Sequence, residues 1–151
     1  PLHVAAWCDS VEVAQLLIDR GAQIDPVETN WSNTPFDFAV YGRHQRMIDL
    51  LAPYIRDVWN LTLTGKIDRL REVLSAEPER AREVNENNAT PLMWLPDDDQ
   101  IAVEAAQLLI AAGADPSNVR KDGVTAADIA RRRGLDHAAS LLDSATAVDD
   151  D

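Results

Sequence analysis

The side chains that could perform nucleophilic or acid–base chemistry in this chain are three histidines and one cysteine, His3, His44, His137 and Cys8. Such catalysis needs a nucleophile, a base and an orienting group that converge in one pocket. The histidines lie far apart in the sequence, and the cysteine has neither a neighbouring base nor a known nucleophile signature around it. We therefore predict that the chain is not an enzyme.

The acidic run Asp97-Asp98-Asp99 suggests a calcium site at first sight. Calcium loops place oxygen ligands at spaced positions, with a glycine for the sharp turn and a distal bidentate acid. The run lacks this arrangement, so we interpret it as a solvated acidic turn. We predict no metal ion and no cofactor.

Composition narrows the possible partners. The net charge of -12 makes nucleic acid a poor partner, because phosphate binding needs a basic face, and the arginine triplet 131–133 is too small to change this. The absence of a run of about 18 apolar residues predicts no membrane span. A single cysteine excludes an internal disulfide framework and favours a reducing compartment, the cytoplasm. The 12 arginines against 2 lysines favour a GC-rich, bacterial genome.

One segment returns along the chain at a near-constant interval. Residues 1–6 return at 34–39, 90–95 and 125–130. The prolines of the first two copies, Pro1 and Pro35, are 34 residues apart, and the last two copies start 35 residues apart. A leucine pair follows each copy, at 16–17, 50–51, 108–109 and 141–142. Self-similarity at this period predicts stacked repeats, each a helical unit that buries its apolar face against its neighbours.

Local signals place helices within each repeat. Threonines suited to helix N-caps precede three of the copies, at Thr34, Thr90 and Thr125. Gly21 and Gly113 follow the second helices and suit the positive φ of a helix end. At the break between the first two helices stands Asp9, which tolerates the left-handed region, where later repeats have Gly65 and Gly134.

This pattern resembles the ankyrin repeat over nearly the whole chain. The resemblance implies an all-α solenoid of stacked helix-turn-helix repeats with short β-hairpin fingers on one edge. His3 matches the histidine of the family's Thr-Pro-Leu-His signature, which implies a structural hydrogen bond between repeats.

We divide residues 1–151, a single ankyrin-repeat domain, into about five repeats. They are a truncated first repeat at 1–28, a second at 29–56, a degenerate third at 57–84, a fourth at 85–119 and a capping repeat at 120–143, followed by an acidic tail at 144–151 that we expect to fray. Because the chain opens on Pro1 in the middle of a repeat, we expect further repeats before it. Without them Ala5, Val13 and Leu17 should be uncovered.

The connection between the second and third repeats is short. Only six residues separate Leu51 from Asp57, where equivalent connections take 17 or 18. Pro53 also stops the preceding helix. We predict that no finger lies between Leu51 and Val58.

Aromatic residues are the best candidates for a binding surface, since interfaces enrich Trp and Tyr. The resemblance implies that partners dock on the finger tips and the inner helices. The candidate partner-binding residues are Trp7, Trp31, Asn33 and Tyr41. Trp31 either contacts a partner or folds over the flank left bare by the missing finger. We interpret Trp59 and Trp94 as structural residues, the latter in place of a buried aliphatic one.

These observations predict a non-enzymatic module that binds a protein partner through its concave face. The acidic charge favours a partner with a basic rim. Two alternatives stay open: a structural or regulatory spacer within a larger multidomain protein, and a regulatory domain attached to an enzyme outside this sequence.

Overall fold

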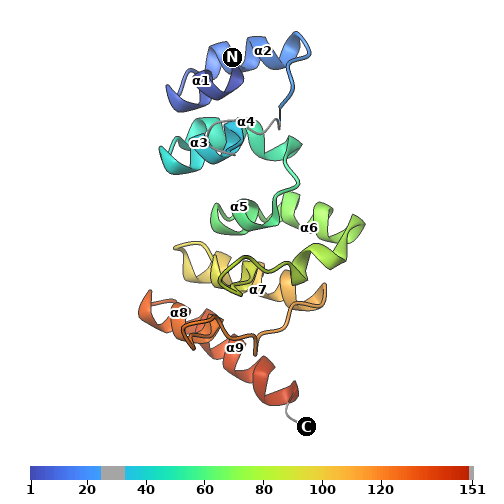
Figure 1. Cartoon of the computed structure of the whole chain (residues 1–151), viewed down its shortest axis with the longest axis vertical. Helices are drawn as coiled ribbons and strands as arrows, with labels where there is room; N and C mark the ends of the chain where they lie inside the picture. The colour runs from blue at the N-terminus through green and yellow to red at the C-terminus, as the bar shows by residue number, and fades with distance from the viewer. Residues whose placement is uncertain (25–32, 150–151) are drawn as a thin grey trace. The chain divides into compact units, whose positions relative to one another are not determined.

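The computed structural model describes residues 1–24 and 33–149, and this part of the chain is helical (Figure 1). The predicted all-α fold is therefore confirmed. The chain divides into two compact units, Pro1–Arg56 and Asp57–Asp151, which we call the N-terminal and C-terminal units. Their boundary falls where we divide the second repeat from the third; the five-repeat division itself stays a prediction.

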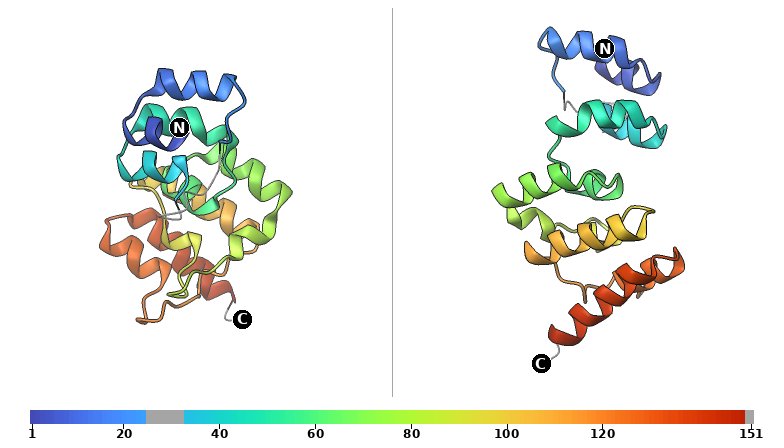
Figure 2. Two further views of the ribbon diagram at one scale, coloured as in Figure 1. Left: turned by 45° about the horizontal axis from the view of Figure 1, so that its top comes forward. Right: turned by 180° about the vertical axis from the view of Figure 1, so that it is seen from behind.

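Two helix pairs and a 3-10 turn form the N-terminal unit: α1 (Leu2–Trp7), α2 (Val11–Asp19), α3 (Pro35–Tyr41), α4 (Gln45–Leu51) and η1 (Ala52–Tyr54). Within this unit α1 packs against α3 and α2 against α4, so that equivalent helices of successive pairs lie side by side (Figure 1, Figure 2). Its core contains the fully buried side chains of Phe36, Met47 and Leu51. Buried alanines at positions 6 and 14 allow the helices to approach closely.

The C-terminal unit comprises α5 (Val58–Leu63), α6 (Ile67–Ala76), η2 (Pro78–Arg82), η3 (Pro91–Met93), α7 (Asp99–Ala111), α8 (Ala126–Arg132) and α9 (Asp136–Asp149). Successive pairs are α5 with α6, η3 with α7, and α8 with α9. The 3-10 turn η3 contacts both α5 and α8, so it occupies the place of a first helix. Leu61, Leu70, Leu92, Leu109 and Leu142 are fully buried in this unit.

Two of the predicted threonine caps are confirmed as capping boxes. The Thr34 hydroxyl accepts from the Asp37 amide at 3.1 Å, while the Asp37 carboxylate accepts from the Thr34 amide at 2.7 Å. Thr125 and Asp128 repeat this exchange at 3.2 and 3.1 Å. Each box satisfies amides that the first helical turn leaves without partners.

The third predicted cap, Thr90, is wrong. Its side chain caps no helix, and its buried hydroxyl has no hydrogen-bond partner among the described residues. The position three residues later is Met93 rather than an aspartate, and Pro96 disfavours helical backbone at the residue before it. The segment consequently forms the short turn η3 in place of an α-helix.

The breaks that we predicted adopt the left-handed conformation. Asp9 has φ 54°, and the glycines at 21, 65, 113 and 134 have φ of 82°, 70°, 112° and 77°. A second non-glycine residue, Arg43, has φ 56° at the equivalent break between α3 and α4. At both breaks of the N-terminal unit the residue with positive φ is therefore not a glycine.

The predicted β-hairpin fingers do not appear in the described residues. Pairing there is limited to one isolated antiparallel bridge, between Val119 and Thr125. Most of the first predicted finger falls on residues 25–32, outside the described residues. The finger predicted to be missing is absent as expected, because Leu51 leads through η1 to α5 without any β-pairing. That prediction is confirmed.

The exposure expected at the first repeat is correct in part. Val13 is 50% exposed and Leu17 is half-buried, but Ala5 is buried. The expectation for Ala5 was wrong because α1 contacts both α2 and α3, which cover its short side chain. At the tail α9 continues to Asp149, and the Thr146 hydroxyl donates to the Leu142 carbonyl at 2.8 Å. The fraying expected of the tail stays a prediction.

Candidate functional site

Two of the predicted binding residues, Trp7 and Tyr41, are the last residues of α1 and α3. These helices lie side by side, and the two side chains are 61% and 64% exposed. The Trp7 ring meets Phe38 edge to face, with centroids 5.5 Å apart and an interplanar angle of 83°. We call Trp7, Phe38 and Tyr41 the aromatic row. It offers aromatic surface on consecutive first helices.

The other two candidates are placed differently. Asn33 is half-buried, and its backbone carbonyl accepts from His3 Nε2 at 3.1 Å. This confirms the structural hydrogen bond that the resemblance implied for His3, and it requires the tautomer with a proton on Nε2. Trp31 lies outside the described residues, so both of its interpretations stay predictions.

The potential chemistry-bearing residues do not converge. His44 donates from Nδ1 to the Ala6 carbonyl at 3.0 Å and so joins the two helix pairs of the N-terminal unit. His137 lies in the C-terminal unit, with Nδ1 2.7 Å from the Asp99 carboxylate. Cys8 is an exposed thiol. Among the described residues, no three His, Cys, Asp or Glu side chains gather as metal ligands.

Each aspartate of the run 97–99 has a separate structural contact. Asp97 pairs with Arg133 at 2.6 Å, and Asp98 caps α7 by accepting from the amides of residues 100 and 101. Asp99 accepts from the amides of His137 and Ala138, both at 3.0 Å, and so caps α9 of the following pair. The hydrogen bond from the His137 amide is the main reason that the pKa of Asp99 is lowered.

A hollow of about 470 Å³ lies on the loop side of the C-terminal unit. It is lined by Asn85, Asn87, Trp94, Arg120, Lys121 and Asp122. Trp94 is 37% exposed, although it stands where the family resemblance implies a buried aliphatic residue. We call this site the tryptophan hollow.

Trp94 packs against a second tryptophan. Its ring meets Trp59 edge to face, with centroids 5.1 Å apart and an angle of 75°. The Trp59 indole donates to the Glu83 carboxylate at 2.9 Å. The two tryptophans are 35 residues apart, one repeat interval, so the repeat period itself indicated that they would be neighbours.

The two loops that line the hollow are hydrogen-bonded to each other. The Asn88 side-chain amide donates to the Val119 carbonyl at 2.7 Å, and the Asn118 amide donates to the Asn88 carbonyl at 2.7 Å. The backbone amide of Lys121 donates to the Asn87 carbonyl at 3.0 Å. These hydrogen bonds connect the two loops without a paired β-hairpin.

The polar wall of the hollow carries one ion pair and one further cation. Arg120 pairs with Asp122, and this guanidinium lowers the pKa of the Asp122 carboxyl. Lys121 is exposed, and its ammonium makes no ion pair within the described part of the chain. The lining therefore has a net charge of +1 in a chain whose net charge is -12.

A family model for ankyrin repeats, described as occurring in many copies, matches residues 2–52. This segment, about a third of the chain, is therefore similar to ankyrin repeats. The whole length of the chain is also similar in fold to the crystal structure of an ankyrin repeat domain from Acinetobacter baumannii AYE, with 19% identity, a TM-score of 0.53 and coverage of 96% of this chain and 97% of that one. A search of curated proteins finds no match. None of the described helices has the length and apolar character needed to cross a membrane.

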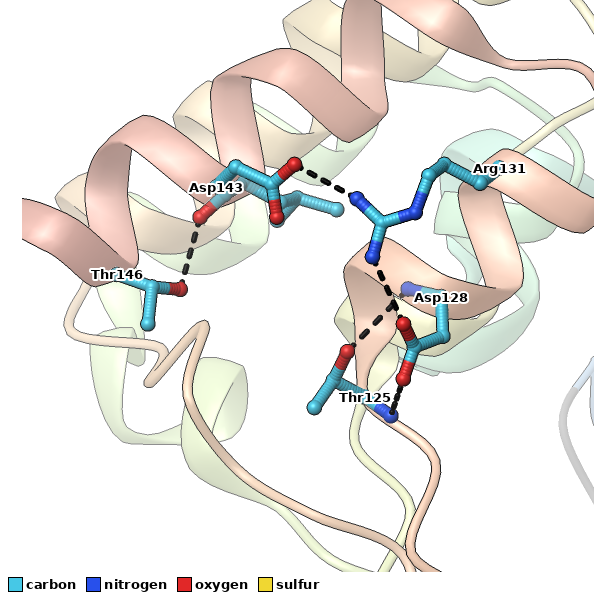
Figure 3. A network of polar contacts seen from close by, with 6 residues as sticks. Thr125, Asp128, Arg131, Asp143 and Thr146 are labelled. Atoms are coloured by element: carbon cyan, nitrogen blue, oxygen red, sulfur yellow. Dashed lines mark hydrogen bonds and ion pairs between the residues drawn. The ribbon is translucent and has the colours of Figure 1, made fainter.

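A polar network links the two helices of the last pair, α8 and α9 (Figure 3). Arg131 donates to Asp128 at 2.8 Å and to Asp143 at 2.6 Å, and so links the capping box of α8 to α9. Hydrogen bonds from Thr125 and then Arg131 lower the pKa of Asp128. Arg131 is thus committed to intramolecular contacts.

Proposed function

We propose that this chain is a non-enzymatic module that binds a protein partner through the concave face of its repeats, with the aromatic row as the main contact. The observation that carries this proposal is the exposure of Trp7 and Tyr41 at equivalent ends of adjacent helices. Ankyrin repeats are in general protein-interaction modules. Tryptophan and tyrosine are enriched among the residues that dominate binding energy.

The packing of the row supports this role. Phe38 meets both the Trp7 ring and the His3 ring edge to face, with ring centroids 5.5 and 5.7 Å away. A side chain held in this way loses little conformational freedom when a partner covers it, so more of the buried area contributes to affinity. The net charge of -12 supports a partner with a basic rim, because complementary charge speeds association more than it raises affinity.

Site-specific photocrosslinking in cells of the source organism tests the proposal. Trp7 or Tyr41 is replaced by benzoylphenylalanine in the full chain, and Tyr54, an exposed aromatic residue outside the first helices, serves as the matched control. We expect the same protein to be captured from positions 7 and 41 and not from position 54. Capture from position 54 alone would place the interface elsewhere, and capture from none would favour the spacer alternative.

The captured protein then allows a quantitative test. Trp7→Ala and Tyr41→Ala should each weaken its binding by about 30-fold or more, which is the loss typical of a central anchor of about 2 kcal/mol. The loss should appear mainly as faster dissociation. Tyr54→Ala should leave both rate constants within about twofold of the unchanged chain.

A further inference from the structure

We propose that the tryptophan hollow is a second binding site, which takes a short acidic segment of a partner protein: one carboxylate at Lys121 and a neighbouring apolar side chain against Trp94. This proposal is independent of the aromatic row, because every residue that carries it belongs to the C-terminal unit.

The size and lining of the hollow suit a peptide. Its volume of about 470 Å³ lies within the range of ligand sites, which combine apolar walls with a few convergent polar groups. Trp94 supplies the apolar wall. Asn87 also lines the hollow, and its side-chain amide can pair with peptide backbone groups.

The charge of the hollow selects an anion. Arg120 is neutralised by Asp122, whereas the ammonium of Lys121 makes no ion pair among the described residues. A carboxylate of the ligand can form an ion pair with the Lys121 ammonium, whereas a lysine or arginine side chain would be repelled by it. The hollow therefore favours an acidic ligand, whereas the net charge of the whole chain favours a basic partner.

The hollow is also preorganised. The reciprocal Asn88 and Asn118 contacts fix the two loops, and the Asn85 carboxamide oxygen accepts from the amides of residues 87 and 89 at 2.9 and 3.0 Å. The Trp94 ring packs against Trp59, whose indole N–H donates to the Glu83 carboxylate. A ligand that binds to fixed groups loses less free energy to ordering.

The test uses the full chain labelled with ¹⁵N and a pair of acetylated, amidated tetrapeptides that differ at one position. One contains phenylalanine followed by glutamate, and the other contains phenylalanine followed by glutamine. We expect the glutamate peptide to shift the indole N–H signals of Trp59 and Trp94, and to bind about fivefold more tightly than the glutamine peptide at low salt. This preference should diminish at about 0.5 M salt, where charges are screened within a few ångströms.

Variants of the two lysines provide matched controls. Lys121→Gln should remove the preference for the glutamate peptide, whereas Lys66→Gln removes the same charge away from the hollow and should retain it. Trp94→Ala should abolish binding of both peptides. Equal binding of both peptides, a preference that survives Lys121→Gln, or shifts confined to Trp7 would each overturn the proposal. The last outcome would leave the aromatic row as the only supported site. Failure of the crosslinking test would count against the aromatic row and would not affect the proposal for the hollow.

Discussion

The two units of this chain join their repeats by different means. In the N-terminal unit successive pairs are joined by histidine side chains and small buried residues, and both inter-helix breaks force a non-glycine residue into the left-handed region. Val4, Val13 and Leu16 remain exposed there. In the C-terminal unit, Gly65 and Gly134 supply the positive φ at two of the three equivalent breaks, and the break before α7 has no positive φ. The side chains of Arg133, Asp99 and Asn118 contact the neighbouring repeat.

One repeat pattern can therefore give units of different stability. Left-handed backbone at a residue with a Cβ costs about 1–2 kcal/mol, and Asp9 and Arg43 carry this cost at the inter-helix breaks of the N-terminal unit. We expect the C-terminal unit to resist local unfolding better than the N-terminal unit. The N-terminal unit is also the one with the exposed aromatic row.

The largest expected effect comes from emptying the core of the N-terminal unit. Phe36 is fully buried, and Phe36→Ala should cost about 3–5 kcal/mol, because a large cavity remains. Hydrogen exchange should show lost protection in α1–α4, while α6, α7 and α9 keep theirs. The control, Tyr41→Ala, removes an exposed aromatic residue from the same helix and should leave protection nearly unchanged. Equal loss in both units after Phe36→Ala would mean that they unfold as one.

Two threonines at equivalent positions should respond to the same substitution with opposite signs. Thr125→Val removes a capping box and should cost about 1 kcal/mol. Thr90→Val replaces a buried hydroxyl that has no described partner and should stabilise the chain by about 1 kcal/mol. Urea denaturation of both variants measures the difference. A loss of stability in Thr90→Val would show that its hydroxyl is hydrogen-bonded in solution.

The break residues allow a smaller, reciprocal test. Arg43→Gly should stabilise the N-terminal unit by about 0.5–1 kcal/mol, because glycine accepts φ 56° without strain. Gly65→Ala should destabilise the C-terminal unit, since its φ is 70° and a Cβ there would lie 3.0 Å from Ile101. Thermal unfolding of the two variants compares them directly. Opposite signs from these would contradict our account of the breaks.

The smallest expected effect is an acid sensitivity of the last helix pair. The pKa values of Asp99 and Asp128 are lowered in the folded chain, so their stabilising contribution is complete above the usual aspartate pKa of about 4 and is lost as the pH falls through the folded values. Amides of α8 and α9 should therefore exchange faster near pH 3 than the intrinsic rate explains. The double variant Asp99→Asn with Asp128→Asn should show a flatter pH profile, and an unchanged profile would reject this cause.

Much of the fold follows from local sequence. The repeat interval and the leucine pairs predict the helix pairs, and Gly21 and Thr34 act through their own neighbours, so their roles could be read without a structure. Thr90 failed because a proline six residues later shortened the helix that it would have capped. A cap depends on the whole first turn, and the threonine alone does not establish one.

The candidate sites were harder to predict because they depend on contacts between repeats. Asp99 caps a helix that begins at residue 136, and no local sequence pattern predicts a contact between residues so far apart in the chain. Taken separately, Trp59 and Trp94 give no sign of a site. Their separation of one repeat interval makes them neighbours, and Trp94 lines the hollow. Trp7 and Tyr41 were found because they occupy equivalent positions on adjacent first helices, where the repeat pattern alone predicts exposure.

Hydrogen exchange of the full chain, alone and with the protein captured through Trp7, tests the central claim most directly. If the aromatic row is the main contact, amides of α1 and α3 should become more protected in the complex, and the gain should be lost in Trp7→Ala. Protection confined to α5–α9, or no change in either unit, would contradict the claim that the partner docks on the aromatic row.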